Sequence, residues 1–184
     1  MNPETAPQLR PIAELNQLAV SAFADAVRPL FEAAGPLAGA LHAERPFTSY
    51  TDLIDRAESV AGRLSTAEQI EVVSAHPRIG ESAAALRQTS ALSYREQGSD
   101  REASVPPDEL QSVYDELARL NLAYEQRFGF RFVVFVNGRP KCEIVSVLQA
   151  RLRTSPDADE ELQEGLRAMF LIARDRLSRL TADG

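Results

Sequence analysis

Hydrophobic side chains along this sequence recur mainly at intervals of three and four residues, which is the spacing of one face of an α-helix. Proline and glycine stand between the periodic stretches, so the pattern predicts helices in series. A chain of 184 residues suits one domain with a core of its own. We therefore expect an all-α fold, a multi-helix bundle in a single domain over residues 1–184.

Capping residues and prolines mark where the expected helices begin and end. Ser49 or Thr48 can cap the helix with the clearest apolar face, and Ser65 followed by Glu68 predicts a helix that must end near Pro77. Pro29 is expected to break the first long helix into two pieces. The helices expected on this basis cover about residues 11–34, 35–42, 49–64, 65–76, 92–97, 107–128, 141–152 and 159–180.

One apolar segment does not fit the helical pattern. Residues 130–136, with the sequence FRFVVFV, are β-branched, aromatic or basic, and by propensity alone they favour a β-strand. No second segment offers such a strand a partner. We therefore expect a buried connector, extended or helical, that ends at Asn137 and Gly138.

Composition narrows the function classes. The chain has 20 basic and 27 acidic residues and a net charge of −7, which disfavours binding to nucleic acid. A single cysteine, Cys142, excludes an internal disulfide, and two histidines are too few for a Cys/His zinc site. The sequence shows no signal peptide, no membrane-spanning run and no cofactor-binding motif, so we expect a cytoplasmic protein without metal or cofactor.

His76 is the first candidate for chemistry. It is followed by Pro77 at the expected end of a helix, where the negative end of the helix dipole favours the imidazolium form. Such a group can donate or accept a proton. The alternative is a solvent-facing histidine that only caps the helix before a proline.

A polar cluster at residues 93–97 is the second candidate. Ser93, Glu96 and Gln97 bring a hydroxyl, a carboxylate and a carboxamide within about one helical turn. A carboxylate beside His76 would stabilise its charged form and fix its orientation. The alternative is a short solvated helix.

Two arginines are the third candidate. Arg151 and Arg176 each fall seven residues after an apolar residue, which places them on the buried faces of the last two helices. A buried guanidinium needs an anionic partner, and a substrate carboxylate or ring oxygen would serve. An internal ion pair with a glutamate would serve equally well.

The motifs together resemble those of one family. HPRIG at 76–80, SYREQ at 93–97 and NLAYEQRFGFRFVV at 121–134, with RL at 176–177, are similar to the motifs of the 2-oxo-4-hydroxy-4-carboxy-5-ureidoimidazoline (OHCU) decarboxylases. These are the third enzymes of urate breakdown. The resemblance runs from about Ser65 to Leu180.

The resemblance implies a helical, homodimeric enzyme that converts OHCU to (S)-allantoin and CO2 without a cofactor. Its partner would be a small purine-derived molecule, not nucleic acid or a membrane. The chain ends without a Ser-Lys-Leu address, which favours the cytosol.

The resemblance also implies roles for particular residues. His76 would be the catalytic acid/base, and Glu96 would be its partner. Arg176 would be the arginine that binds substrate, with Arg151 as the alternative. The other implied substrate-binding residues are Pro77, Ser93, Gln97, Phe130, Arg131, Phe132 and Val133.

Two other functions remain open at this point. One is a helical interaction module without catalysis, in which HPRIG only ends a helix and the arginines are paired internally. The other is a different lyase or hydrolase that acts on purine-derived ureides.

Overall fold

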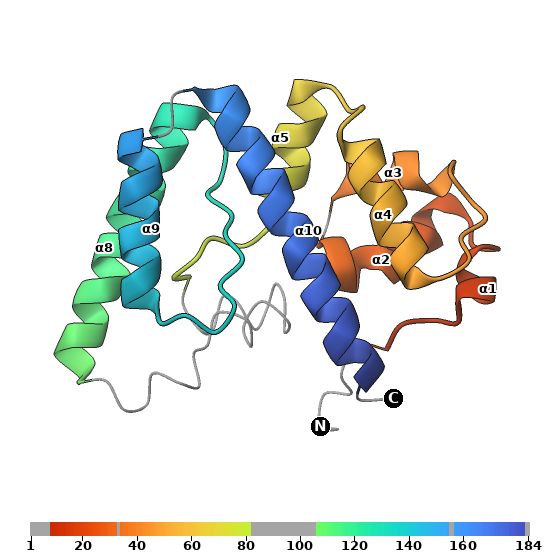
Figure 1. Cartoon of the computed structure of the whole chain (residues 1–184), viewed down its shortest axis with the longest axis horizontal. Helices are drawn as coiled ribbons and strands as arrows, with labels where there is room; N and C mark the ends of the chain where they lie inside the picture. The colour runs from red at the N-terminus through yellow and green to blue at the C-terminus, as the bar shows by residue number, and fades with distance from the viewer. Residues whose placement is uncertain (1–7, 33, 82–105, 155–156, 183–184) are drawn as a thin grey trace. The chain divides into compact units, whose positions relative to one another are not determined.

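The computed structural model describes residues 8–32, 34–81, 106–154 and 157–182. These residues form helices and no β-strand, as the spacing of apolar residues predicts (Figure 1). The chain divides into two compact units, residues 1–75 with 169–184 and residues 76–168. The helices are α1 Ile12–Leu15, α2 Val20–Phe31, α3 Gly35–His42, α4 Tyr50–Ala61, α5 Thr66–Ser74, α8 Pro107–Phe128, α9 Lys141–Thr154 and α10 Ala158–Ala182.

The first unit is built around α3, which packs against α2, α4 and α5 (Figure 1). The C-terminal part of α10 belongs to the same unit, where Phe170 meets Phe31 of α2 edge-on, with ring centroids 6.2 Å apart. Burial of such side chains removes apolar surface from water and stabilises the unit. Fully buried core residues include Phe23, Leu30, Leu37, Leu41, Leu53 and Ile54.

The expected helix caps are confirmed. The Ser49 side chain accepts a hydrogen bond of 3.0 Å from the backbone N–H of Asp52 at the start of α4. At the start of α5, Ser65 and Glu68 form a capping box, with each side chain bonded to the other residue's backbone N–H. Each cap satisfies backbone donors that the first helical turn leaves without partners.

The expected break at Pro29 is wrong. Pro29 lies inside α2, which continues for two more residues, and the interruption falls earlier, between α1 and α2. The Asn16 side chain explains it, because its amide donates to the Phe47 carbonyl (2.8 Å) and accepts from the Phe47 N–H (2.9 Å). This tertiary contact spans 31 residues, so local proline chemistry does not reveal it. A proline near a helix end disrupts only the last turn.

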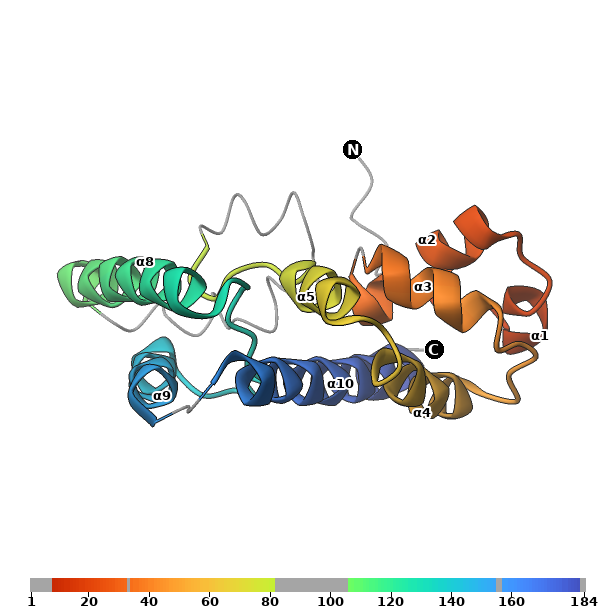
Figure 2. The same cartoon turned by 90° about the horizontal axis from the view of Figure 1, so that it is seen from above.

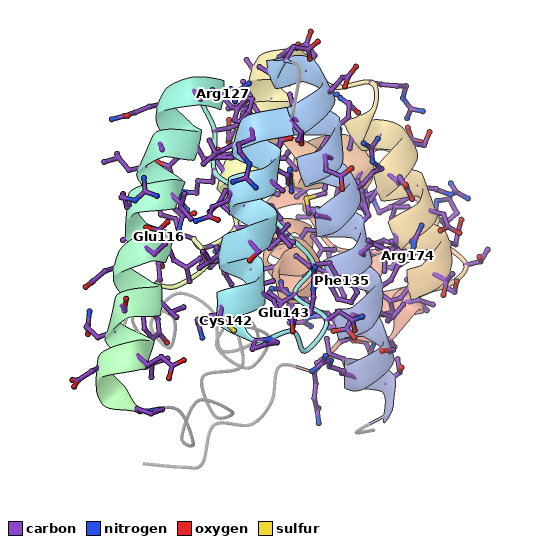
Figure 3. The ribbon with its side chains drawn as sticks, turned by 60° about the vertical axis from the view of Figure 1, so that its left-hand side comes forward. Glu116, Arg127, Phe135, Cys142, Glu143 and Arg174 are labelled. Carbon is purple, nitrogen blue, oxygen red and sulfur yellow. The ribbon has the colours of Figure 1, made fainter. Side chains whose placement is uncertain are left out.

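The second unit contains α8 and α9, which lie side by side (Figures 1 and 2). Gln149 of α9 donates to the Glu116 carboxylate of α8 at 3.0 Å. Arg127, near the C-terminal end of α8, donates to the Leu152 carbonyl of α9. Glu116 and Arg127 both extend from α8 in Figure 3. Two side-chain contacts, one from the middle of α8 and one from its C-terminal end, therefore tie the two helices together.

The connector between α8 and α9 is extended, which confirms one of its two expected forms. Helix α8 ends at Gly129, whose φ of +84° places it in the left-handed region. Residues 130–136 follow without helical or strand hydrogen bonding, and Phe130, Phe132, Val133 and Val136 are buried. The expected turn at Asn137 and Gly138 is present, with φ values of +49° and +72°.

Helix α10 agrees with the expected last helix within two residues at either end. None of the described helices has a stretch that is apolar and long enough to span a lipid bilayer. The expected short helix at residues 92–97 lies outside the described residues.

Candidate active site

The loop after α5 carries His76 and lies in the second unit. His76 comes two residues after the last residue of α5 and is only 4% exposed. Its backbone carbonyl accepts a hydrogen bond of 3.0 Å from the guanidinium of Arg131 in the connector. His76 is therefore buried, unlike a solvent-facing cap, and its backbone is attached to a segment 55 residues later.

Two further contacts fix the His76 loop, residues 76–80, to α8. The guanidinium of Arg78 donates to both carboxylate oxygens of Glu125, at 2.6 and 2.7 Å. The amide of Asn121 donates to the Ile79 carbonyl at 2.9 Å and to the Leu117 carbonyl at 2.8 Å. The contacts of Glu125, Asn121 and Arg131 all join the HPRIG motif to the NLAYEQRFGFRFVV segment. The two motifs, which are separate in the sequence, therefore meet here.

Gly80 allows the close approach of the His76 loop to α8. Its φ is +82°, a left-handed conformation that side chains other than glycine rarely adopt. A Cβ atom at this position would lie 2.9 Å from Leu117 Cδ1. Both the backbone angle and the space therefore require the glycine of HPRIG.

Electrostatics reinforce the attachment of the loop. The hydrogen bonds from Arg78 hold the pKa of Glu125 below its usual value, and the charge of nearby Arg131 acts in the same direction. The bond to Glu125 in turn raises the pKa of Arg78. Asn121 is buried, and its Oδ1 atom has no hydrogen-bond partner among the described residues. Within the described part of the chain, that oxygen is therefore an acceptor that no protein donor satisfies close to the His76 loop.

The connector packs two of its aromatic residues on Tyr124 of α8. The ring centroid of Tyr124 lies 6.0 Å from Phe130 and 5.2 Å from Phe132 of the connector, and 4.7 Å from Phe128 of α8 itself. Arg131 is half-buried between its buried neighbours and points a guanidinium nitrogen at the His76 carbonyl. The aromatic string that resembles a strand in the sequence is thus a core element beside the His76 loop.

Both candidate arginines form internal ion pairs with glutamates. Arg151 pairs with Glu161 in the second unit, and their side chains are 14% and 4% exposed. Arg176 pairs with Glu32 at 2.7 Å in the first unit, with 1% and 9% exposure. The internal ion pair with a glutamate, which the sequence analysis gave as the alternative to a substrate anion, is therefore present for each arginine. A role for Arg176 or Arg151 in substrate binding stays a prediction.

The structure brings some predicted site residues together and does not describe others. His76, Pro77 and the segment 130–133 lie in one unit, and Arg131 of that segment bonds the His76 carbonyl. Ser93, Glu96 and Gln97 lie outside the described residues. Asn121 and Glu125 are residues that the sequence analysis did not propose. An amide on the apolar face of a helix is the signal that could have drawn attention to Asn121.

No group of three or more His, Cys, Asp or Glu side chains is placed to hold a metal ion within the ranges that the structure describes. The polar groups around the His76 loop are an imidazole, an amide, guanidinium groups and the Glu125 carboxylate, which is paired with Arg78. Such a set can move a proton and bind the polar edges of a small anionic ring.

Comparison with known proteins identifies the family. A model of the OHCU decarboxylase family matches residues 16–178. The chain belongs to this family. It is 29% identical over 170 residues to the 2-oxo-4-hydroxy-4-carboxy-5-ureidoimidazoline decarboxylase of Halalkalicoccus jeotgali, covering 92% of this chain and 91% of that protein. It is also 31% identical over 170 residues to the uric acid degradation bifunctional protein PucL of Bacillus subtilis.

The relatives of this chain differ in length. The chain spans about a third of the length of PucL and of a second bifunctional Bacillus protein, 32% in each case. Its fold is similar to that of a crystal structure of OHCU decarboxylase in the presence of (S)-allantoin, with a TM-score of 0.63 and 21% identity over 86% of this chain and 98% of that one. The match in fold includes the helical architecture that the sequence predicts.

Proposed function

We propose that this protein converts OHCU to (S)-allantoin and CO2 in urate breakdown, as a carboxy-lyase without a cofactor. The observation that carries the proposal is the family match over residues 16–178. The contacts that join the HPRIG loop to the segment 121–134 support it, because two motifs of the resemblance then lie in contact with each other.

The reaction requires the protein to position the substrate and to supply one proton. The bond between the carboxylate carbon and the hydroxyl-bearing ring carbon breaks, CO2 leaves, and the electron pair forms a double bond to the ureido-bearing ring carbon while the imine nitrogen takes up a proton. The conjugated imine and carbonyl delocalise that pair, so the substrate itself acts as the electron sink. The hydroxyl then loses its proton to become a carbonyl as a proton adds to one face of the ureido-bearing carbon, which completes (S)-allantoin. The enzyme must bury the carboxylate, hold the ring and deliver that proton.

His76 is the proposed proton donor, with Glu96 as the partner that stabilises its charged form. Burial of His76 supports this role, because a shielded imidazole delivers a proton to a bound substrate without competition from water. Pro77, Ser93 and Gln97 are proposed to contact the substrate. So are Arg176 and the connector residues 130–133.

The wider assignments rest on the same family membership. Both compact units are proposed to act as one domain over residues 1–184, because the family match covers parts of both. We also propose a homodimer in the cytoplasm, with a small purine-derived molecule as its partner and no binding to nucleic acid or membranes. Light scattering tests the dimer, which should have about twice the chain mass of 20.2 kDa.

Circular dichroism of freshly made OHCU tests the activity. Uricase and its partner hydrolase generate the intermediate in place, and the wild-type protein should produce optically active allantoin rapidly. His76→Ala should lower kcat/KM on the order of 10²–10⁴-fold, since positioned acid/base catalysis typically contributes that much. The far-ultraviolet spectrum of the variant should keep its helical form.

The other histidine provides the matched control. His42 lies in the first unit, where its Nε2 atom is 3.1 Å from the Leu18 carbonyl, and His42→Gln should keep the wild-type rate. Slow racemic decay with the wild-type protein would favour an interaction module. Loss of the intermediate without optically active allantoin would favour another ureide enzyme. Wild-type rates in His76→Ala would refute the role of His76.

A further inference from the structure

Among the described residues, the Arg151 guanidinium forms hydrogen bonds to three groups of the protein. Its Nε atom donates to the Glu161 carboxylate at 2.5 Å, and one terminal nitrogen donates to the Val133 carbonyl at 2.9 Å. The other terminal nitrogen pairs with Glu161 and lies 3.4 Å from the Tyr124 hydroxyl. The Tyr124 hydroxyl itself donates to Glu161 at 2.5 Å. The guanidinium is therefore part of a hydrogen-bonded network with Glu161, Tyr124 and the Val133 carbonyl inside the second unit.

Arg151 of this network contacts two consecutive residues of the connector. The Arg151 guanidinium bonds the Val133 carbonyl and lies 4.8 Å from the centroid of the Phe132 ring, within cation–π range. The connector has neither helical nor sheet hydrogen bonds to fix its backbone. A buried carbonyl without such a partner needs another donor, and Arg151 supplies it.

A buried ion pair is a poor device for stability alone. Removing two charges from water offsets most of their attraction, and apolar replacements of similar volume are often as stable. The Arg151–Glu161 pair instead orients the groups bonded to it, because the planar guanidinium holds the carboxylate and the connector carbonyl in fixed directions. Glu161 holds the guanidinium in place, and Arg151 transmits that placement to the backbone.

We propose that Arg151 and Glu161 are positioning residues for the decarboxylation, which set the connector segment 130–133 against the substrate. Arg151 acts through the Val133 backbone and the Phe132 ring and does not bind the substrate itself. This assignment rests on the proposed function, since it concerns the wall of the same site. It leaves Arg176 as the arginine predicted to bind substrate.

A paired neutral replacement separates positioning from stability. Arg151→Met with Glu161→Gln removes both charges, keeps similar volumes and leaves an acceptor for the Tyr124 hydroxyl. We expect a folded protein whose kcat/KM for OHCU falls about 10²-fold, because small misplacements of a site wall have effects of that size. We expect kcat to change more than KM and the enantiomeric excess of (S)-allantoin to fall.

The control carries the same two changes on the surface of the same unit. Arg167 and Glu164 form an exposed pair on α10, with side chains 62% and 49% exposed. Arg167→Met with Glu164→Gln should leave kcat/KM and the enantiomeric excess unchanged. Thermal unfolding of both double variants shows how much of any loss comes from stability.

Arg151→Lys provides a second test that does not depend on the fold of the double variant. An ammonium keeps the charge beside Glu161 but cannot reproduce the fork that also reaches Val133. The melting temperature should therefore recover further than kcat/KM does. Activity that follows the melting temperature in both variants would overturn the positioning role, and so would wild-type kcat with wild-type enantiomeric excess in the double variant. Absence of wild-type activity would instead contradict the proposed function.

Discussion

The two segments that meet around His76 are held in different ways. Residues 130–133 of the connector are fixed by a buried aromatic cluster and by the Arg151–Glu161 ion pair, whose side chains are 14% and 4% exposed. The His76 loop, residues 76–80, is fixed by one buried amide and by the Arg78–Glu125 pair, whose side chains are 44% and 22% exposed. Its third contact is a single bond from Arg131 to the His76 carbonyl.

We therefore expect the connector to be the more rigid of the two segments and the His76 loop to be the more adjustable. Buried aromatic contacts contribute more to stability than partly exposed ion pairs, so the connector should open only with its unit. The contacts of the His76 loop are individually weaker and should open at lower free energy. Substitutions in the connector should therefore affect stability most, whereas substitutions at the loop should affect catalysis more than stability.

Phe132→Ala should have the largest effect on stability. Phe132 is 1% exposed and meets both the Tyr124 ring and the Arg151 guanidinium. Removal of a buried phenyl ring typically destabilises by about 3–5 kcal/mol. Urea unfolding measures the change. Phe23→Ala, at a fully buried position of the first unit, is the matched control, and only Phe132→Ala should also lower kcat/KM at low urea. Equal kinetic effects would contradict the distinction.

Asn121→Ala should have an intermediate effect on stability and a larger one on the reaction. The change removes two donors, and the Ile79 carbonyl loses its bond to the Asn121 amide, which should destabilise by about 2 kcal/mol. Because the Ile79 carbonyl lies three residues from His76, kcat should fall by more than the stability change explains. Steady-state kinetics with urea unfolding checks this, and a normal kcat would show that the amide does not position the loop.

Gly80→Ala should follow, because it combines strain with a close contact. The left-handed φ of +82° disfavours alanine by about 1–2 kcal/mol, and the new Cβ would press on Leu117. Gly129→Ala is the control for strain alone, since its φ is +84° and nothing lies within 4 Å of its Cβ position. We expect similar losses from strain in both, with a drop in kcat only for Gly80→Ala. Equal kinetics would count against a role of the close approach in catalysis.

Glu125→Gln should have the smallest effect, and that effect should depend on pH. Arg78 lowers the pKa of Glu125 from its usual 4.5 in the folded protein, so the unfolded chain binds this proton more tightly. The stabilisation is present above pH 4.5 and is lost as the pH falls through the lower, folded pKa. Urea unfolding should show a gap of about 0.5–1 kcal/mol between wild type and variant at pH 7, which closes in acid. A gap that is constant down to pH 3 would exclude this ion pair as its origin.

Local chemistry made much of the fold predictable. Ser49 and Ser65 with Glu68 act within one turn of their helices, so their capping roles can be read from neighbouring residues. The lack of a strand partner predicted a buried connector but left its form open between extended and helical, and the structure has the extended form. The position of the first helix break was missed because Asn16 ends α1 through a contact with Phe47, which no local pattern reveals.

The candidate site was less predictable because its contacts are long-range. Arg78 and Glu125 are 47 residues apart, and Arg176 and Glu32 are 144 apart. The sequence indicated that the buried arginines needed anions, but it did not identify Glu161 or Glu32 as the internal ones. His76 was recognised from its motif, whereas the residues that hold its loop emerged only from the geometry.

A double-mutant cycle on His76 and Glu96 tests the central claim most directly. In the proposed mechanism these two side chains act as one proton-delivering unit on OHCU. His76→Ala and Glu96→Gln should each lower kcat/KM for formation of (S)-allantoin, and the double variant should be no slower than the slower single variant. A double variant whose loss equals the product of the two single losses would show that the residues act independently and would contradict the account.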